Sequence, residues 1–217
     1  MSGIWWALGV SGFSLAVLGY YAFIYLPAQL HRWRCAGLKA LSQIVVLRTG
    51  GRYGKPEPMV SLASHIALEL GLSLQERRRL ELAVYLRDIG MVGIPYNVLN
   101  AQERSSTEQM VFEHHPEMGA AIAEQIPGLG GTAPIVRYHH AVYSEQTDAP
   151  IGALILSALE EFLSLSDKAG IEQALATLRG GAGERFHPEV VEALCKVVRT
   201  RTHLWGLPLD RAAALWL

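Results

Sequence analysis

Side chains that could bind a metal fall in a few short segments of this chain. They are Arg87-Asp88, His114-His115-Pro116-Glu117 and His139-His140. Neutral imidazole and carboxylate are ligands for divalent transition metals, whereas a guanidinium has no lone pair to give and stays charged at any biological pH. The pattern predicts a metallohydrolase site that has been partly dismantled, with Arg87 standing where a ligand is expected.

The segment Ile4–Leu26 carries no charged side chain. As a helix it would be about 34 Å long, which is sufficient to cross a bilayer. Aromatic residues lie near both of its ends, as interfacial belts do. Arg32, Arg34 and Lys39 follow it, so the positive-inside rule predicts a single pass through the inner (cytoplasmic) membrane, with the amino terminus outside and the domain in the cytoplasm. The alternatives are a buried core helix and a cleaved signal peptide, although no basic region precedes the segment and no small-residue cleavage site follows it.

The charge and the cysteines of the chain limit the partners and metal ligands that can be expected. A formal net charge of -1 gives no indication of a nucleic-acid partner, and basic residues cluster beside the membrane segment, where anionic headgroups would attract them. Cys35 and Cys195 belong to no CxxC pair and are expected to be reduced thiols without a metal role. The expected partners are the membrane and a cyclic dinucleotide, a protein partner or a second copy of the chain.

The apolar spacing of the remaining chain predicts an all-α fold, with one transmembrane helix followed by a helical domain. We expect an anchor at 1–30, a linker helix at 31–48, the domain at 49–204 and an apolar tail at 205–217. The linker helix either packs on its own domain or forms a short parallel coiled coil. Helices are predicted over Met59–Leu70, Leu74–Ile89, Ser106–His114, Pro116–Gln125, Gly131–Val142, Pro150–Ser164, Ile171–Arg179 and Pro188–Thr202.

Several segments resemble the HD-GYP branch of the HD phosphohydrolases, in the same order along the chain. The stretch LAVYLRDIGMVGIPYNVL is similar to the family's LHDIGKIGIPD-IL, HHPEMGA to THPEIGA, and APIVRYHH to its histidine pair. PIGALILSALEEF resembles PLGARILAVADAF, and GAGERFHPEVVEA resembles GAGTQFDPEVVEA. The resemblance runs from about Thr49 to Arg199. It implies an all-helical fold with a bi- or trinuclear iron or manganese centre that hydrolyses cyclic di-GMP.

The resemblance also implies roles for individual residues. Asp88 matches the aspartate that bridges two metals. His115, His139 and His140 match metal-binding histidines, and Glu160 falls at the last metal-binding aspartate.

The chain departs from the family at other positions. Arg87 replaces the histidine of the HD pair, Met91 replaces a lysine thought to touch substrate phosphate, and the upstream histidine lands near Lys55. His65 and Glu57 lie nearby and could substitute for that histidine. The segment AVYSEQTDAP after His139-His140 lacks the Gly-Tyr-Pro loop.

Two functions follow from this comparison. The first is a membrane-anchored, catalytically inactive HD-GYP-like domain that acts in signalling or as a protein-interaction scaffold, linked to cyclic di-GMP, with Arg87 replacing a metal by pairing with Asp88 and Glu160. The second is an active metal-dependent phosphodiesterase that uses one divalent ion of iron, manganese or zinc, held by Asp88, His115, His139 and His140. The histidines could also be hydrogen-bonded core residues that bind nothing.

Overall fold

The computed structural model describes residues 2–53, 56–146 and 148–205. The chain divides into two compact units, residues 1–37 and residues 38–217. All regular elements of the described part are helices, and the sole strand-like pairing there is an isolated bridge between Ala182 and Phe186. The predicted all-α fold is therefore confirmed. The apolar tail predicted at 205–217 lies outside the described residues apart from Trp205.

The first unit is helical and apolar. It contains α1 (Ser2–Tyr20), a π-helical segment (Tyr21–Tyr25) and the beginning of α2 (Leu26–Arg48). Its large apolar side chains are exposed, as at Trp6, Phe13 and Phe23. By length and composition, the helical stretch Gly3–Arg48 is able to cross a membrane.

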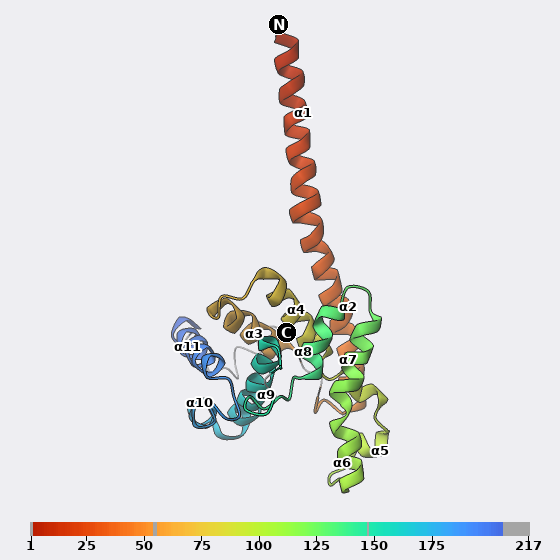
Figure 1. Cartoon of the computed structure of the whole chain (residues 1–217), viewed down its shortest axis with the longest axis vertical. Coiled ribbons are helices and arrows are strands. Elements are labelled where there is room, and N and C mark those ends of the chain that lie inside the picture. The colour runs from red at the N-terminus through yellow and green to blue at the C-terminus, as the bar shows by residue number, and fades with distance from the viewer. Residues whose placement is uncertain (1, 54–55, 147, 206–217) are drawn as a thin grey trace. The chain divides into compact units, whose positions relative to one another are not determined.

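The second unit starts within α2 and contains the remaining helices. They are α3 (Glu57–Glu69), α4 (Leu74–Leu86), α5 (Tyr96–Asn100), α6 (Ser106–Glu113), α7 (His115–Gln125), α8 (Ala133–Arg137), α9 (Ile151–Ala169), α10 (Ile171–Gly180) and α11 (Pro188–Trp205). Helix α9 lies at the centre of this unit, in contact with α3, α4, α8, α10 and α11 (Figure 1). Its apolar face is fully buried, with Ile155, Leu159 and Phe162 at 0% exposure.

Several helix boundaries differ from the sequence prediction. Helix α4 ends at Leu86, and a 3₁₀ segment follows at Ile89–Gly93, so Arg87 and Asp88 lie in the turn after the helix rather than within it. Helix α8 ends at Arg137, well before the predicted Val142, and the short helix α5 was not predicted. Local periodicity does not reveal such ends, because a turn with apolar residues has the same spacing as a helix.

Gly90 and Gly119 permit a close approach that organises the site. A Cβ atom at Gly90 would lie 2.0 Å from the carbonyl oxygen of His115 and 2.6 Å from the amide nitrogen of Gly119. Any larger side chain would therefore separate the turn after α4 from the start of α7. This contact brings the segment that carries Asp88 against the segment that carries His115.

Candidate metal centre

Arg87 and Asp88 occupy a buried turn at the end of α4. The helix begins with a capping box, in which Ser73 and Glu76 satisfy each other's backbone amides. Its last turns are apolar and buried, so the chain continues into the interior, and Arg87 and Asp88 are only 7% and 6% exposed. Buried charges of this kind are stable only when they are paired or hydrogen-bonded.

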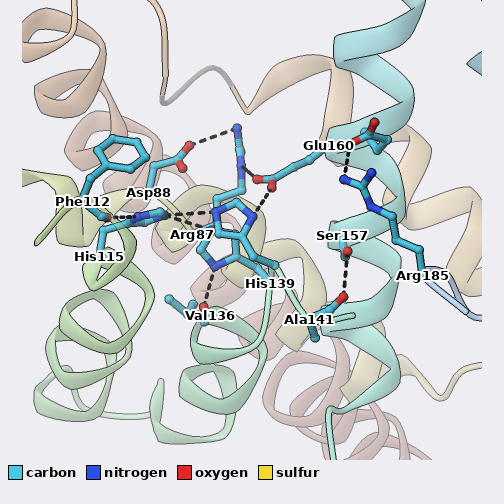
Figure 2. Close-up of polar contacts among 12 residues, drawn as sticks. Arg87, Asp88, Phe112, His115, Val136, His139, Ala141, Ser157, Glu160 and Arg185 are labelled. Atoms are coloured by element: carbon cyan, nitrogen blue, oxygen red, sulfur yellow. Dashed lines mark hydrogen bonds and ion pairs between the residues drawn. The ribbon is translucent and has the colours of Figure 1, made fainter. Parts of the chain in front are cut away.

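The guanidinium of Arg87 contacts both carboxylates of the predicted site. Its Nε donates a hydrogen bond to Glu160 Oε1 at 2.9 Å, and its Nη2 lies 3.1 Å from Asp88 Oδ2. A further hydrogen bond joins Nη1 to the carbonyl of Val84 at 3.0 Å. Figure 2 shows the Arg87 side chain between Asp88 and Glu160. The side chain thus points into the site, and the predicted contacts with both carboxylates are present.

Three histidines from two separate segments converge beside this cation. His115 is the first residue of α7, and His139 and His140 lie in the turn after α8. The Nε2 atom of His115 is 3.4 Å from Nε2 of His139 and 3.3 Å from Nε2 of His140. On a continuous helix, adjacent residues point about 100° apart. Because α8 has ended, the rings of His139 and His140 instead face the same site, with centroids 3.9 Å apart.

The other ring nitrogen of each histidine is already engaged. His115 Nδ1 lies 2.9 Å from the carbonyl oxygen of Phe112, and His139 Nδ1 lies 2.6 Å from that of Val136. His140 Nδ1 lies 3.0 Å from Glu160 Oε2. Each acceptor favours a proton on Nδ1, which in a neutral ring leaves the lone pair on Nε2.

Burial and charge set the protonation of these groups in a consistent way. Burial lowers the pKa of His139 to about 4 and also lowers the pKa of His115, so both are neutral near pH 7. Burial opposes protonation of His140, but the hydrogen bond from its ring to Glu160 and the charge of that carboxylate outweigh burial and raise its pKa. Burial opposes ionisation of Glu160 in the same way, yet His140, His139 and Arg87 together hold the pKa of Glu160 at about 2.

The donor set fits one divalent metal. With metal–nitrogen bonds of about 2.0–2.1 Å, the edge of a tetrahedral site is about 3.3–3.4 Å, and the two Nε2 separations around His115 are 3.4 and 3.3 Å. The second shell also fits, because ligating histidines usually donate their other N–H to a carbonyl or carboxylate. His115, His139 and His140 can therefore hold a metal without a change of backbone.

A second metal would need donors that are already engaged. Asp88, His139 and Glu160 also lie close enough together to hold an ion. Both of these carboxylates contact Arg87, however, and the single free nitrogen of His139 belongs to the three-histidine group. The geometry thus provides one complete ligand set and one that is occupied by a cation of the protein itself.

Other residues considered from the sequence lie outside the cluster or outside the described part. Lys55 and the side chain of Glu57 are among the residues that the structure does not describe. His65 is half-buried, with Nδ1 at 2.7 Å from the carbonyl of Ser61 in its own helix. Met91 is buried, and His114 is exposed beside Glu117.

The carbonyl acceptors of the histidines and the contact of His115 with an aromatic ring were not predicted from the sequence. The ring of Phe112 lies 5.5 Å from the ring of His115, and the guanidinium of Arg104 lies over the Phe112 ring, 3.9 Å from its centroid. The carbonyl oxygens of Phe112 and Val136 each accept a hydrogen bond from the Nδ1 of the histidine three residues later. A histidine just after a helix end faces carbonyls that lack a helical partner, and that spacing was the available signal.

Comparison with known proteins places the chain in a family. A family model described as HD domain matches residues 39–190. The chain is 30% identical over 176 residues to the cyclic di-GMP phosphodiesterase response regulator RpfG of Xanthomonas campestris pv. campestris (strain 8004), which covers 73% of this chain and 47% of that protein. It is 26% identical over 166 residues to a cyclic di-GMP phosphodiesterase of Thermotoga maritima, which covers 69% of this chain and 45% of that protein.

The chain therefore spans about half the length of the curated relatives that it matches. The matched residues 39–190 include both the Arg87-Asp88 turn and the histidine cluster. The resemblance inferred from the sequence motifs is confirmed. This chain belongs to the HD domain family and is homologous to cyclic di-GMP phosphodiesterases.

Proposed function

We propose that this chain is a membrane-anchored HD domain of cyclic di-GMP signalling that lacks a two-metal hydrolytic centre and acts by binding a cyclic dinucleotide or a protein. The observation that carries the proposal is the position of Arg87 between Asp88 and Glu160. Two-metal hydrolysis needs a pair of ions a few ångströms apart to clamp the attacking and leaving oxygens. A fixed guanidinium neutralises the carboxylates that would otherwise attract one of those ions.

The chemistry of the side chains supports a structural role for Arg87. A guanidinium offers planar, fixed donors to two carboxylates, which is the geometry that arginine provides and lysine does not. Its charge cannot be removed at biological pH, so no proton transfer can convert it into a metal ligand or a general base. The guanidinium thus pairs with both carboxylates without a metal, and the pKa of Glu160 is held low.

The membrane part of the proposal rests on the first unit of the chain. Its helix is long and apolar enough to span a bilayer, its apolar side chains are exposed, and the basic residues Arg32, Arg34 and Lys39 follow. We place the amino terminus outside and the HD domain in the cytoplasm. We expect the full chain to stay in membranes after an alkaline wash, and release by the wash would contradict the membrane anchor. We expect protease to digest the domain only in inverted vesicles, and digestion in right-side-out vesicles would contradict the orientation.

Turnover and metal content of the purified full-length chain test the loss of two-metal chemistry. We expect no hydrolysis of cyclic di-GMP and at most one equivalent of divalent metal per chain. The variant Arg87→His should raise the metal content relative to the natural chain, because it returns a donor beside Asp88 and frees both carboxylates. Two equivalents in the natural chain, or cyclic di-GMP turnover that Asp88→Ala abolishes, would refute the proposal.

A single-metal phosphohydrolase is the second candidate, and the convergence of His115, His139 and His140 favours it. A bound divalent metal supplies Lewis-acid polarisation of a phosphate and activation of water. In this candidate the three imidazoles hold that ion and the carbonyls of Phe112 and Val136 orient two of the rings.

Hydrolysis of bis-p-nitrophenyl phosphate distinguishes this candidate from the first one. It predicts activity with one metal equivalent, lost in His139→Ala and retained in His114→Ala, the adjacent exposed histidine. One bound metal without any phosphoesterase activity would exclude the candidate and leave the first proposal in place.

A further inference from the structure

Helix α2 has two faces with different surroundings. Within residues 38–217, Leu38, Ser42 and Val45 are buried against the domain. At 100° per residue, Ile44 and Leu47 lie on the opposite side of the helix. They remain 42% and 82% exposed, so apolar residues extend along a face that the domain leaves uncovered.

The uncovered face follows the spacing of a coiled coil. Its residues alternate between steps of four and three along α2. They are Leu26, Leu30, Trp33, Gly37, Ala40, Ile44 and Leu47. This spacing defines the a and d positions of a heptad repeat, with Ile44 at a and Leu47 at d, the arrangement that favours two parallel strands. We infer that this face, which we call the α2 seam, is an interface with a second copy of the chain in parallel orientation.

The flanking residues distinguish between the two orientations. Positions e are Arg34, Leu41 and Arg48, and positions g are occupied by Gln29, Ala36 and Gln43. A parallel pair places each g residue beside an e residue of its partner, which brings Gln29 to Arg34. An antiparallel pair brings e residues together, so the like charges of Arg34 and of the partner's Arg48 would lie at the same level, although Arg48 donates a hydrogen bond to the Ile94 carbonyl of its own domain at 2.8 Å.

Lipid does not account for the carboxyl-terminal half of the seam. If Ile4–Leu26 spans the bilayer, as proposed above, then Ile44 lies about 27 Å further along the helix. Membrane headgroup layers are only several ångströms thick. Ile44 and Leu47 would therefore face water in a monomer, whereas a second copy would cover them.

The size of the seam indicates where the dimer forms. A strip about 32 Å long and about 11 Å wide presents about 350 Å² on each chain, or about 700 Å² in a pair. Stable interfaces bury at least about 1,200 Å². The α2 seam alone therefore gives a weak dimer, and confinement of both chains to one bilayer supplies the high local concentration that it needs. The small residues Gly37 and Ala40 let the two backbones approach closely at mid-seam.

Disulfide cross-linking of the full-length chain in membranes tests the inference. Single cysteines replace Ile44 or Leu47 in a Cys35→Ser background, in which the other cysteine, Cys195, is buried. Matched controls carry Lys39→Cys at position c, or only the natural Cys35 at position f. Parallel a and d residues fall within the roughly 7 Å limit for a disulfide, whereas c and f residues lie beyond it.

We expect mild oxidation to give covalent dimers for Ile44→Cys and Leu47→Cys, at least about tenfold more than for either control. Equal cross-linking at every position would indicate random collision and overturn the inference, as would no cross-linking at Ile44 and Leu47. Cross-links formed between a cysteine at Leu30 and one at Leu47, but not between two copies of Ile44→Cys, would indicate an antiparallel pair and also overturn it. Extraction by an alkaline wash identifies any variant that has failed to insert, so loss of anchoring is scored separately.

Discussion

Replacing Arg87 with methionine removes the cation of the site but keeps a side chain of considerable length. Asp88 and Glu160 lose their contacts at 3.1 and 2.9 Å, and the carbonyl of Val84 loses its hydrogen bond. Removing one partner of a buried ion pair costs about 3–5 kcal/mol, because the remaining charge is uncompensated. At about 2–4 °C per kcal/mol for a chain of this size, the midpoint of thermal unfolding should fall by about 6–20 °C.

Circular dichroism of the detergent-solubilised chain measures this loss, and Arg137→Met provides a matched control. Arg137 also makes a 2.9 Å contact, to Glu124, but both side chains are substantially exposed. An exposed pair contributes about 0–1 kcal/mol, so the control should shift the midpoint by no more than a few degrees.

Divalent metal should partly rescue the Arg87→Met variant. With the guanidinium gone, Asp88 and Glu160 become available as ligands, and a metal that binds only the folded chain stabilises it by about 2.7 kcal/mol at 100 times its dissociation constant. Manganese or zinc should therefore raise the midpoint more in Arg87→Met than in the natural chain. Equal unfolding midpoints for Arg87→Met and Arg137→Met, with no additional response of Arg87→Met to metal, would refute the structural role of Arg87.

The remaining predictions concern pH, packing and capping. Burial lowers the pKa of His139 from 6.5 to about 4, so below pH 6.5 the unfolded chain takes up a proton that the folded chain refuses. In metal-free buffer, stability should fall by about 3 kcal/mol from this group as the pH drops from 6.5 to 4, and His139→Gln should flatten that slope in denaturant titrations. Gly90→Ala should destabilise the fold by about 3 kcal/mol or more, since its Cβ would overlap the backbone of His115. Gly93→Ala should destabilise it only slightly, because its Cβ meets only the flexible Met118 side chain, at 3.1 Å. Equal midpoints of thermal unfolding for the two variants would refute the close packing at Gly90. Ser73→Ala should cost about 1 kcal/mol by removing the cap of α4, and an unchanged midpoint would show that the cap contributes little.

The pH window for His139 is separate from the windows of its neighbours. The raised pKa of His140 gives stability that is already fully present below pH 6.5, and the pKa of Glu160 at about 2 gives stability that is lost only as the pH falls below 4.5. Between pH 6.5 and 4.5, stability therefore changes with pH because of His139. His115 contributes in the same direction, because burial lowers its pKa as well.

Sequence patterns were sufficient for the fold class and for a set of residues that the tertiary structure brings close together. Helical periodicity and the capping box at Ser73 are local features, so they are readable in one dimension. The ordered motifs led to the HD family for the same reason. They predicted Asp88, Glu160 and the histidines as neighbours before their distances were known.

The ends of two helices were beyond the reach of these patterns. His139-His140 and Arg87-Asp88 were predicted to lie within helices. Both predictions were wrong, because α8 ends at Arg137 and α4 ends at Leu86. Helix ends depend on which groups take up the last carbonyls, as the ring of His139 does at Val136.

The sequence by itself determined which residue types the candidate site contains, that Arg87 precedes Asp88, and that one apolar segment precedes the domain. Only the tertiary structure decided that the cation faces Asp88 and Glu160, and that three Nε2 atoms converge within reach of one metal. The physical reason is that orientation and distance arise from contacts between segments far apart in the chain, such as the approach of Gly90 to α7. Spacing along the sequence cannot encode such contacts, because they depend on how the helices pack.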